Sequence, residues 1–277
     1  MVRKGILFSA FILTAFVTSA LPANISELAE ILTRAQKENH SIPVLSYRYP
    51  ELDVESAYLV QKSYVQRRLE NDHVAGFKAG LTSKETQKRF GVNFPVAGVL
   101  LYSGKKMSGS IIVGSLFKML VIETEIGFVV GKTIAHPLKE VSELRDRIHS
   151  ITPVVELPDL SFEDLKKVKA VDIIASNVSA AELIVGQEND LDTIDLDNTS
   201  LTLTLDGKVI NEGKGSDALW GQWETALWLV NAVVKQGWKI EPGQILITGV
   251  LGKMIPGKQG RYIADYGTLG KVLFVVK

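Results

Sequence analysis

The order of the expected helices and strands is the sequence feature that most restricts the fold of this chain. Apolar residues at helical spacing mark residues 26–39, 53–71 and 83–90. From residue 96 onward the sequence changes to short runs rich in Val, Ile, Leu and Thr, which Gly, Pro, Asn and Asp separate. Because these runs do not alternate regularly with helices, a doubly wound parallel sheet is disfavoured. The order predicts an α+β fold, with an N-terminal helical part over residues 24–95 and a β-rich body over residues 96–277.

The β-rich body contains seven expected strands and one long expected helix. The helix covers residues 217–236 and carries Trp220, Trp223 and Trp228, which we expect to pack in the core or in an interface. The expected strands are residues 119–130, 152–157, 172–177, 183–186, 201–205, 244–248 and 271–276.

The first twenty residues have the composition of a secretory signal peptide. Arg3 and Lys4 precede an apolar run over residues 6–17, and small residues up to Ala20 follow it. The run is shorter than the roughly 20 residues that span a bilayer. We therefore expect cleavage after Ala20, export to the periplasm or the medium, and no stable membrane span in the mature chain. An uncleaved tether or a buried first helix is the alternative.

Charge and cysteine content exclude several classes of function. The chain has 31 basic and 31 acidic residues, so it lacks the overall positive charge with which proteins hold nucleic acid without regard to sequence. It contains no cysteine, which rules out disulfides, thiolate metal ligands and a cysteine nucleophile. We expect no nucleic-acid partner.

Three glutamates form a candidate metal site. Glu123 and Glu125 stand two residues apart in the apolar run MLVIETEIGFVV, and this spacing places both carboxylates on one face of a strand. Their mutual repulsion in an apolar setting is relieved if a divalent cation supplies the opposite charge. Glu156 lies in a second apolar run, ITPVVELP, and three oxygen ligands of this kind suit Mg²⁺ or Mn²⁺. The alternative is that Glu123 and Glu125 line the solvent face of an edge strand.

Lys78 is the second candidate for chemistry. It is the single charged residue of the segment AGFKAGLTS. A lysine in an apolar segment near a metal can stabilise an enolate, bind a substrate carboxylate or act as an acid or base with a lowered pKa. The alternative is a lysine at a strand end whose ammonium group reaches the solvent.

Six segments, in this order along the chain, resemble the 2-keto-4-pentenoate hydratases and the related 4-oxalocrotonate decarboxylases of the fumarylacetoacetate hydrolase superfamily. The resemblance extends over residues 24–277, and it is specific because the ExE pair and the distant glutamate match in spacing. The segments are GFKAGLTSKETQKRFGVNFP, ETE, VVELPD, DIIASNVS, GKGSDAL and ILITGVLG.

The resemblance implies a rolled mixed sheet, a homo-oligomer and a small-molecule 2-oxo acid as substrate. It implies that Lys78 is the catalytic lysine and that Leu81 and Ser179 bind the substrate. It also implies that Mg²⁺ or Mn²⁺ is held by three ligands, Glu123, Glu125 and Glu156.

Four departures from the family pattern lie at positions expected near the site. Val96 replaces an aspartate that is thought to transfer protons, and Val121 replaces an arginine. Ser176 replaces the aspartate and Val178 the alanine of a DNAS segment. The GHP triplet that opens the long helix becomes Trp220-Gly221-Gln222-Trp223, so its histidine is lost. The loss of a general acid or base removes about 10²–10⁴ in rate. Lys84 and Glu85 are candidates to reach the pocket in its place.

The leading hypothesis is a hydratase that adds water to a small 2-oxo or 2-hydroxydienoic acid, such as 2-hydroxypenta-2,4-dienoate. A decarboxylase or a tautomerase that uses the same site is the second hypothesis, since it depends less on the lost aspartate. The third is an exported protein that binds 2-oxo acids without turning them over.

Overall fold

The computed structural model describes residues 24–191 and 194–277 of the chain. The expected signal peptide, residues 1–20, lies outside the described residues. Within the described ranges, no helix has both the length and the apolar character that crossing a membrane requires.

The described elements follow the predicted α+β order, with helices first and most strands after residue 96. The α-helices are α1 (Ile25–Lys37), α2 (Leu45–Arg48), α3 (Val54–Arg68), α4 (Lys84–Arg89), α5 (Val141–Arg145), α6 (Ala170–Ala175) and α7 (Gln222–Lys235). The strands are β1 (Val74–Gly80), β2 (Val96–Leu101), β3 (Lys105–Met107), β4 (Ser110–Ile112), β5 (Val121–Val130), β6 (Ile148–Leu157), β7 (Glu182–Val185), β8 (Ser200–Leu205), β9 (Lys208–Lys214), β10 (Ile245–Ile247), β11 (Ile255–Pro256), β12 (Gly260–Asp265) and β13 (Lys271–Val276).

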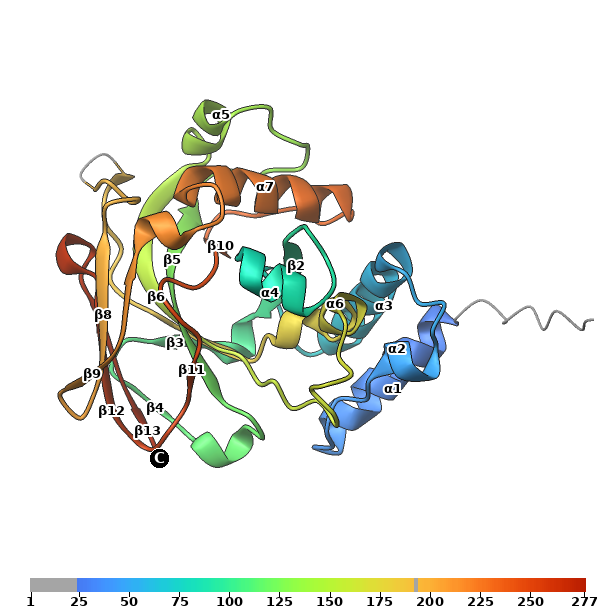
Figure 1. Cartoon of the computed structure of the whole chain (residues 1–277). Helices are drawn as coiled ribbons and strands as arrows, with labels where there is room; N and C mark the ends of the chain where they lie inside the picture. Colours follow the sequence, from blue (N-terminus) through green and yellow to red (C-terminus); the bar gives the residue numbers. More distant parts are fainter. Residues whose placement is uncertain (1–23, 192–193) are drawn as a thin grey trace, which may run out of the picture.

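Two sheets form the β-rich body. The larger sheet has eight strands in the order β2-β1-β10-β5-β6-β7-β3, with β11 paired to β5. Its β1–β10 and β3–β7 pairs are parallel and the others are antiparallel, so the sheet is mixed. The second sheet has five strands in the order β4-β13-β12-β8-β9. Figure 1 shows the larger sheet curled in the middle of the molecule, with the second sheet on one side and α1–α3 on the other.

The two faces of the larger sheet are covered differently. Phe77, Phe128 and their neighbours on one face belong to the main apolar core, where Phe128 packs edge-to-face on Trp223 of α7 at 4.8 Å between ring centres. The other face carries a smaller, separate apolar cluster that includes Val154 and Ile247. Strand alternation places Glu123, Glu125, Glu156 and Lys78 on this second face.

Side-chain caps explain where the N-terminal helices begin. Asn24 accepts a hydrogen bond from the backbone of Glu27, and Asp53 accepts one from Ser56, so both relieve the free N–H groups of a first helical turn. Ser83 and Thr86 form a capping box at the start of α4. The helix ends before Gly91, whose φ of +76° favours glycine.

Two expectations about single elements are wrong. Residues 172–177 are not a strand, because α6 and a short left-handed turn occupy them. Asp172 stabilises this helix by accepting hydrogen bonds from the backbone of Lys169 and from Ser46, and burial on nearly all sides hides the helical period. The long helix begins at Gln222 rather than at residue 217, so Trp220 precedes it and is half exposed.

Candidate metal centre

Three glutamates meet on the inner strands of the larger sheet. Glu123 and Glu125 project from one face of β5, and Glu156 lies directly opposite Glu123 on β6. One carboxylate oxygen from each of the three lies within 4.8 Å of the others. Because β5 lies between β10 and β6, the alternative of an edge strand with solvent-facing carboxylates does not hold.

The cluster is buried and rich in negative charge. Glu125 and Glu156 are fully buried, and Glu123 is partly buried. Burial, followed by the charges of Glu156 and Glu123, raises the pKa of Glu125 well above its usual value. Burial also raises the pKa of Glu156 to about 7, although the ammonium group of Lys78 opposes this shift. Both shifts show that Lys78 alone does not supply enough positive charge to keep all three carboxylates ionised.

Two of the carboxylate oxygens show that the residues fit a divalent ion. Glu125 Oε1 and Glu156 Oε2 are buried and lack a hydrogen-bond partner within the described part of the chain. Buried charged oxygens without partners are costly in free energy, and a hard cation is the ligand that three carboxylates satisfy best. Together they offer the donor set of a Mg²⁺ or Mn²⁺ site.

Lys78 points into the same cluster from β1. Its side chain is 2% exposed, so its ammonium group does not reach the solvent. Nζ donates hydrogen bonds to Glu156 Oε1 and, at 3.2 Å, to the backbone carbonyl of Val178. Burial alone would lower the pKa of Lys78, but the charges of Glu156, Glu123 and Glu125 outweigh burial and raise it. The lysine is therefore held as a cation beside the carboxylates.

A series of hydrogen bonds from the start of α7 through Thr248 and Gly249 orients Glu125. The N–H of Gly249 donates to Glu125 Oε2 at 2.7 Å, and the hydroxyl of the preceding Thr248 donates to Gln222 Oε1. Gln222 is fully buried at the start of α7 and also donates to the carbonyl of Gly215 at 2.7 Å. Strand periodicity did not reveal Gln222, Thr248 or Gly249, although Thr248 and Gly249 belong to the ILITGVLG segment.

The two expected substrate-binding residues have left-handed backbones near the cluster. Leu81 follows β1 with a φ of +53°, and its carbonyl accepts a hydrogen bond from Gln87. Ser179 follows Val178 with a φ of +54°, and its buried hydroxyl has no partner in the described residues. A left-handed conformation costs roughly 1–2 kcal/mol for a residue other than glycine.

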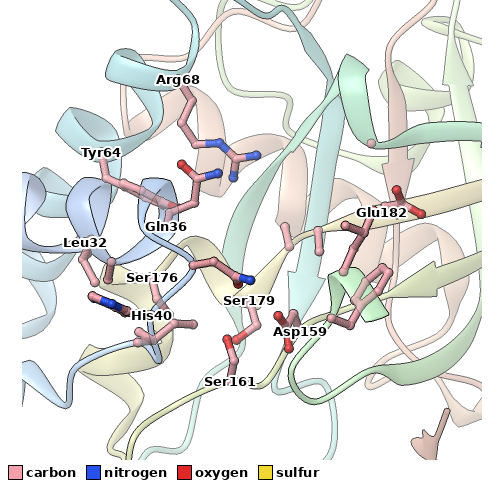
Figure 2. Close-up of a pocket in the computed structure, with 18 of the residues that line it drawn as sticks. Leu32, Gln36, His40, Tyr64, Arg68, Asp159, Ser161, Ser176, Ser179 and Glu182 are labelled. Atoms are coloured by element: carbon pink, nitrogen blue, oxygen red, sulfur yellow. The ribbon is translucent and has the colours of Figure 1, made fainter. Parts of the chain in front are cut away.

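Ser179 also lines a pocket of about 310 Å³ (Figure 2). Ser161 and Ser176 lie near it in this pocket, and Tyr64 and Arg68 of α3 form the far wall. Lys78 and the three glutamates are not among the lining residues, so Ser179 is the predicted site residue that this pocket contains.

The departures from the family pattern have different surroundings. Val96 is fully buried on β2 opposite Gly80, on the same sheet face as Lys78, and Val121 at the start of β5 is 6% exposed. Lys84 and Glu85 are exposed on α4, so neither lies buried with the glutamates.

Comparison with known proteins places this arrangement in a family. The sequence profile described as fumarylacetoacetate (FAA) hydrolase C-terminal matches residues 94–269, more than half of the chain. The chain belongs to the fumarylacetoacetate hydrolase family. The matched range contains Glu123, Glu125 and Glu156, and the family resemblance of the sequence is confirmed.

The relatives within this family include hydratases and a decarboxylase. The 2-oxo-hept-4-ene-1,7-dioate hydratase of Escherichia coli is 28% identical over 253 residues, covering 88% of this chain and 95% of that protein. The 2-keto-4-pentenoate hydratase of Paraburkholderia phymatum is 30% identical over 251 residues, covering 90% and 95%.

The solved structure of the 4-oxalocrotonate decarboxylase from Pseudomonas putida G7, complexed with magnesium and adipate, superposes with a TM-score of 0.85 and 25% identity. The match covers 91% of this chain and 97% of that one. The curled mixed sheet is therefore confirmed as the fold of this family. The chain is an enzyme of the hydro-lyase kind, and a divalent metal ion is its cofactor.

Proposed function

We propose that this enzyme is a hydratase that adds water to a small 2-oxo or 2-hydroxydienoic acid such as 2-hydroxypenta-2,4-dienoate. One observation carries the proposal: three carboxylates lie within 4.8 Å of one another, next to a buried lysine, on an inner face of the family's sheet. The names of the two hydratases that match most of this chain support it.

In this proposal Glu123, Glu125 and Glu156 hold Mg²⁺ or Mn²⁺. When bound, the ion polarises the 2-oxo group of the substrate as a Lewis acid. Lys78 Nζ, fixed by Glu156 and Val178, stabilises the negative charge that develops on the substrate oxygen or delivers a proton to it. Leu81 and Ser179 orient the substrate carboxylate, and the free hydroxyl of Ser179 is available as a donor.

The test is turnover of a dienol by the purified protein. Protein loaded with Mg²⁺ is mixed with 2-hydroxypenta-2,4-dienoate, and the loss of dienol absorbance is followed. A loss faster than the uncatalysed background supports the proposal. No loss, together with tight binding of oxalate, would instead favour a protein that binds 2-oxo acids without turnover.

Decarboxylation or tautomerisation at the same site is a second candidate function. Val96, buried on the sheet face of Lys78, favours it, because an apolar side chain cannot activate the water that hydration needs. The structural similarity to a decarboxylase agrees with this candidate. Release of CO₂ from 4-oxalocrotonate without formation of a hydrated product would make decarboxylation the main reaction.

Oligomerisation and export belong to the same proposal. The side chains of Ile111, Leu116 and Leu273, on or next to the edge strand β4 and its neighbour β13, are exposed apolar groups that support a homo-oligomer. Sedimentation of the mature protein at the mass of a single chain would contradict it. For export, we expect a mature N-terminus after Ala20, which N-terminal sequencing of secreted protein would show.

A further inference from the structure

The segment next to Lys78 has a conformation that the local sequence does not favour. Asn177, Val178 and Ser179 have φ values of +59°, +53° and +54°, so three successive residues other than glycine are left-handed. All three are buried. For the β-branched Val178 this conformation is a genuine outlier. Such backbones persist when the surrounding structure determines them, and they cluster at functional sites.

Asn177 makes the contacts that determine this turn. Its side-chain nitrogen donates to the carbonyl of Val99 at 2.8 Å, and the N–H of Val99 donates to its side-chain oxygen at 2.8 Å. Strand β2, which contains Val99, stands at the end of the sheet order. The amide of Asn177 therefore satisfies both backbone groups of Val99 on the outer edge of β2, as Tyr58 and Gln61 together do for Ala97. In Asn177 this requires a donor and an acceptor on the same side chain.

Two glycines create the space into which the turn fits. A Cβ atom on Gly80 would lie 2.5 Å from Cγ1 of Val178, and one on Gly98 would lie 3.1 Å from Cβ of Val178. Lys78 lies opposite Gly98 in the pairing of β1 with β2. The turn is thus seated directly over the strand residues that flank the lysine.

The turn serves two groups of the proposed active site. The carbonyl of Val178 accepts a hydrogen bond from Lys78 Nζ at 3.2 Å, and the next residue, Ser179, presents its buried hydroxyl without a partner among the described residues. Figure 2 shows the Ser179 side chain at the pocket between Ser176 and Asp159. A single left-handed segment therefore fixes the lysine and presents the serine.

We propose that Asn177 is the positioning residue of this centre. By pairing with Val99 it holds the left-handed turn, and through the turn it sets the direction of Lys78 Nζ toward a bound 2-oxo acid and places Ser179 Oγ at the pocket. The inference rests on the proposed function only in assuming that a metal-bound carboxylate ligand occupies the centre. It concerns ligand binding and does not depend on which reaction follows.

The test compares two matched substitutions of buried amides. Asn177→Asp keeps the shape of the side chain but turns its donor into a second oxygen that faces the carbonyl of Val99. Gln61→Glu makes the same change at a buried amide whose hydrogen bonds go to the carbonyls of Ala97 and Ile174 and not to residues 177–179. Both variants should lose thermal stability. The readouts are calorimetric affinities of the full mature chain for Mn²⁺ alone, and for oxalate after loading with Mn²⁺.

We expect Asn177→Asp to weaken oxalate binding about tenfold or more while Mn²⁺ affinity changes by less than about threefold, and Gln61→Glu to leave both affinities near wild type. If Asn177→Asp does not fold, Asn177→Gly replaces it, because glycine accepts the left-handed φ but lacks the amide. Asn177→Gly should also weaken oxalate binding, by a smaller factor than Asn177→Asp.

Unchanged oxalate affinity in the folded Asn177 variants, or an equal loss in Gln61→Glu, would overturn the proposal. Wild-type protein that binds Mn²⁺ and oxalate but turns over no dienoic acid would contradict the hydratase function alone. Wild-type protein that binds no oxalate would overturn the positioning proposal, whereas the hydratase function is decided by the turnover of the dienoic acid.

Discussion

The strand pairs β5–β6 and β1–β2 build the candidate centre in different ways. On β5–β6, alternation and register alone bring Glu123, Glu125 and Glu156 together. On β1–β2 there is one functional side chain, Lys78, and its direction depends on a left-handed turn from elsewhere in the chain. Val96, which departs from the family pattern, lies on β2 and so belongs to the β1–β2 pair. In the metal-holding half, local pattern places Glu123 and Glu125 and one strand pairing adds Glu156. In the half that faces the substrate, the direction of Lys78 depends on contacts from a separate turn.

The largest difference between the halves is expected for Lys78→Met. This change removes the buried cation of the β1–β2 half and should lower turnover by about 10²–10⁴-fold, because charge on the substrate oxygen loses its partner. Mn²⁺ affinity should not fall, because one competing positive charge is gone. Steady-state kinetics and calorimetry check both. The exposed Lys84→Met is the control, and an equal loss of turnover there would place the functional lysine on α4 instead.

A smaller effect is expected for Val96→Asp. If the missing aspartate limits hydration, this variant should hydrate 2-hydroxypenta-2,4-dienoate about tenfold or more faster than wild type, because the site regains an acid–base group. It should also be less stable, since Val96 is fully buried. Val96→Asn is the control, because asparagine has the shape of aspartate without its acid group, and this variant should not gain activity. A flat response in Val96→Asp would point to a reaction that needs no such group.

Thr248→Val is expected to lower the metal affinity of the β5–β6 half without changing any of the three metal ligands. The hydroxyl that ties the Gly249 segment to Gln222 is lost, so the N–H that orients Glu125 is less well fixed. Mn²⁺ affinity measured by calorimetry should fall by about tenfold. Thr225→Val is the matched control, because Thr225 Oγ1 is buried without a partner in the described chain. An equal loss of Mn²⁺ affinity in Thr248→Val and Thr225→Val would rule out this role of the Thr248 hydroxyl.

The smallest expected effect is on thermal stability without metal. The folded-state pKa of Glu156 is raised from 4.5 to about 7, so the folded chain binds more protons than the unfolded chain between these values. Unfolding then releases protons, and the free energy of unfolding falls as pH rises through this window. The Tm of metal-free protein should drop by roughly 5 °C from about pH 5 to about pH 8, and Mn²⁺ should reverse the drop. A Tm that rises with pH would show that other groups dominate.

The contrast between the halves also explains how much could be predicted from sequence. The period of two in ETE predicted that Glu123 and Glu125 share a strand face, because strand geometry alone produces it. That Glu156 completes the ligand set was implied by the family resemblance, since the β5–β6 register that brings it there is a long-range contact. Strand β1 was not predicted, since its glycines and alanines carry little strand signal. Helix α6 was mistaken for a strand because burial on nearly all sides hides its period.

The left-handed turn could not be predicted from local sequence. Asn177, Val178 and Ser179 include no glycine, and their conformation depends on Val99 and on two glycines of distant strands. Gln222 likewise gains its function only through Thr248, 26 residues away in the chain. Contacts of this kind depend on the assembled fold rather than on any local period.

The central claim is that Glu123, Glu125 and Glu156 share one divalent ion. Calorimetric titration of Mn²⁺ into wild-type protein and into Glu125→Gln tests it most directly, because this change keeps the shape of a fully buried ligand and removes its charge. The account predicts one site per chain in the wild type and no measurable binding in the variant. Equal Mn²⁺ affinities in the two proteins would contradict it.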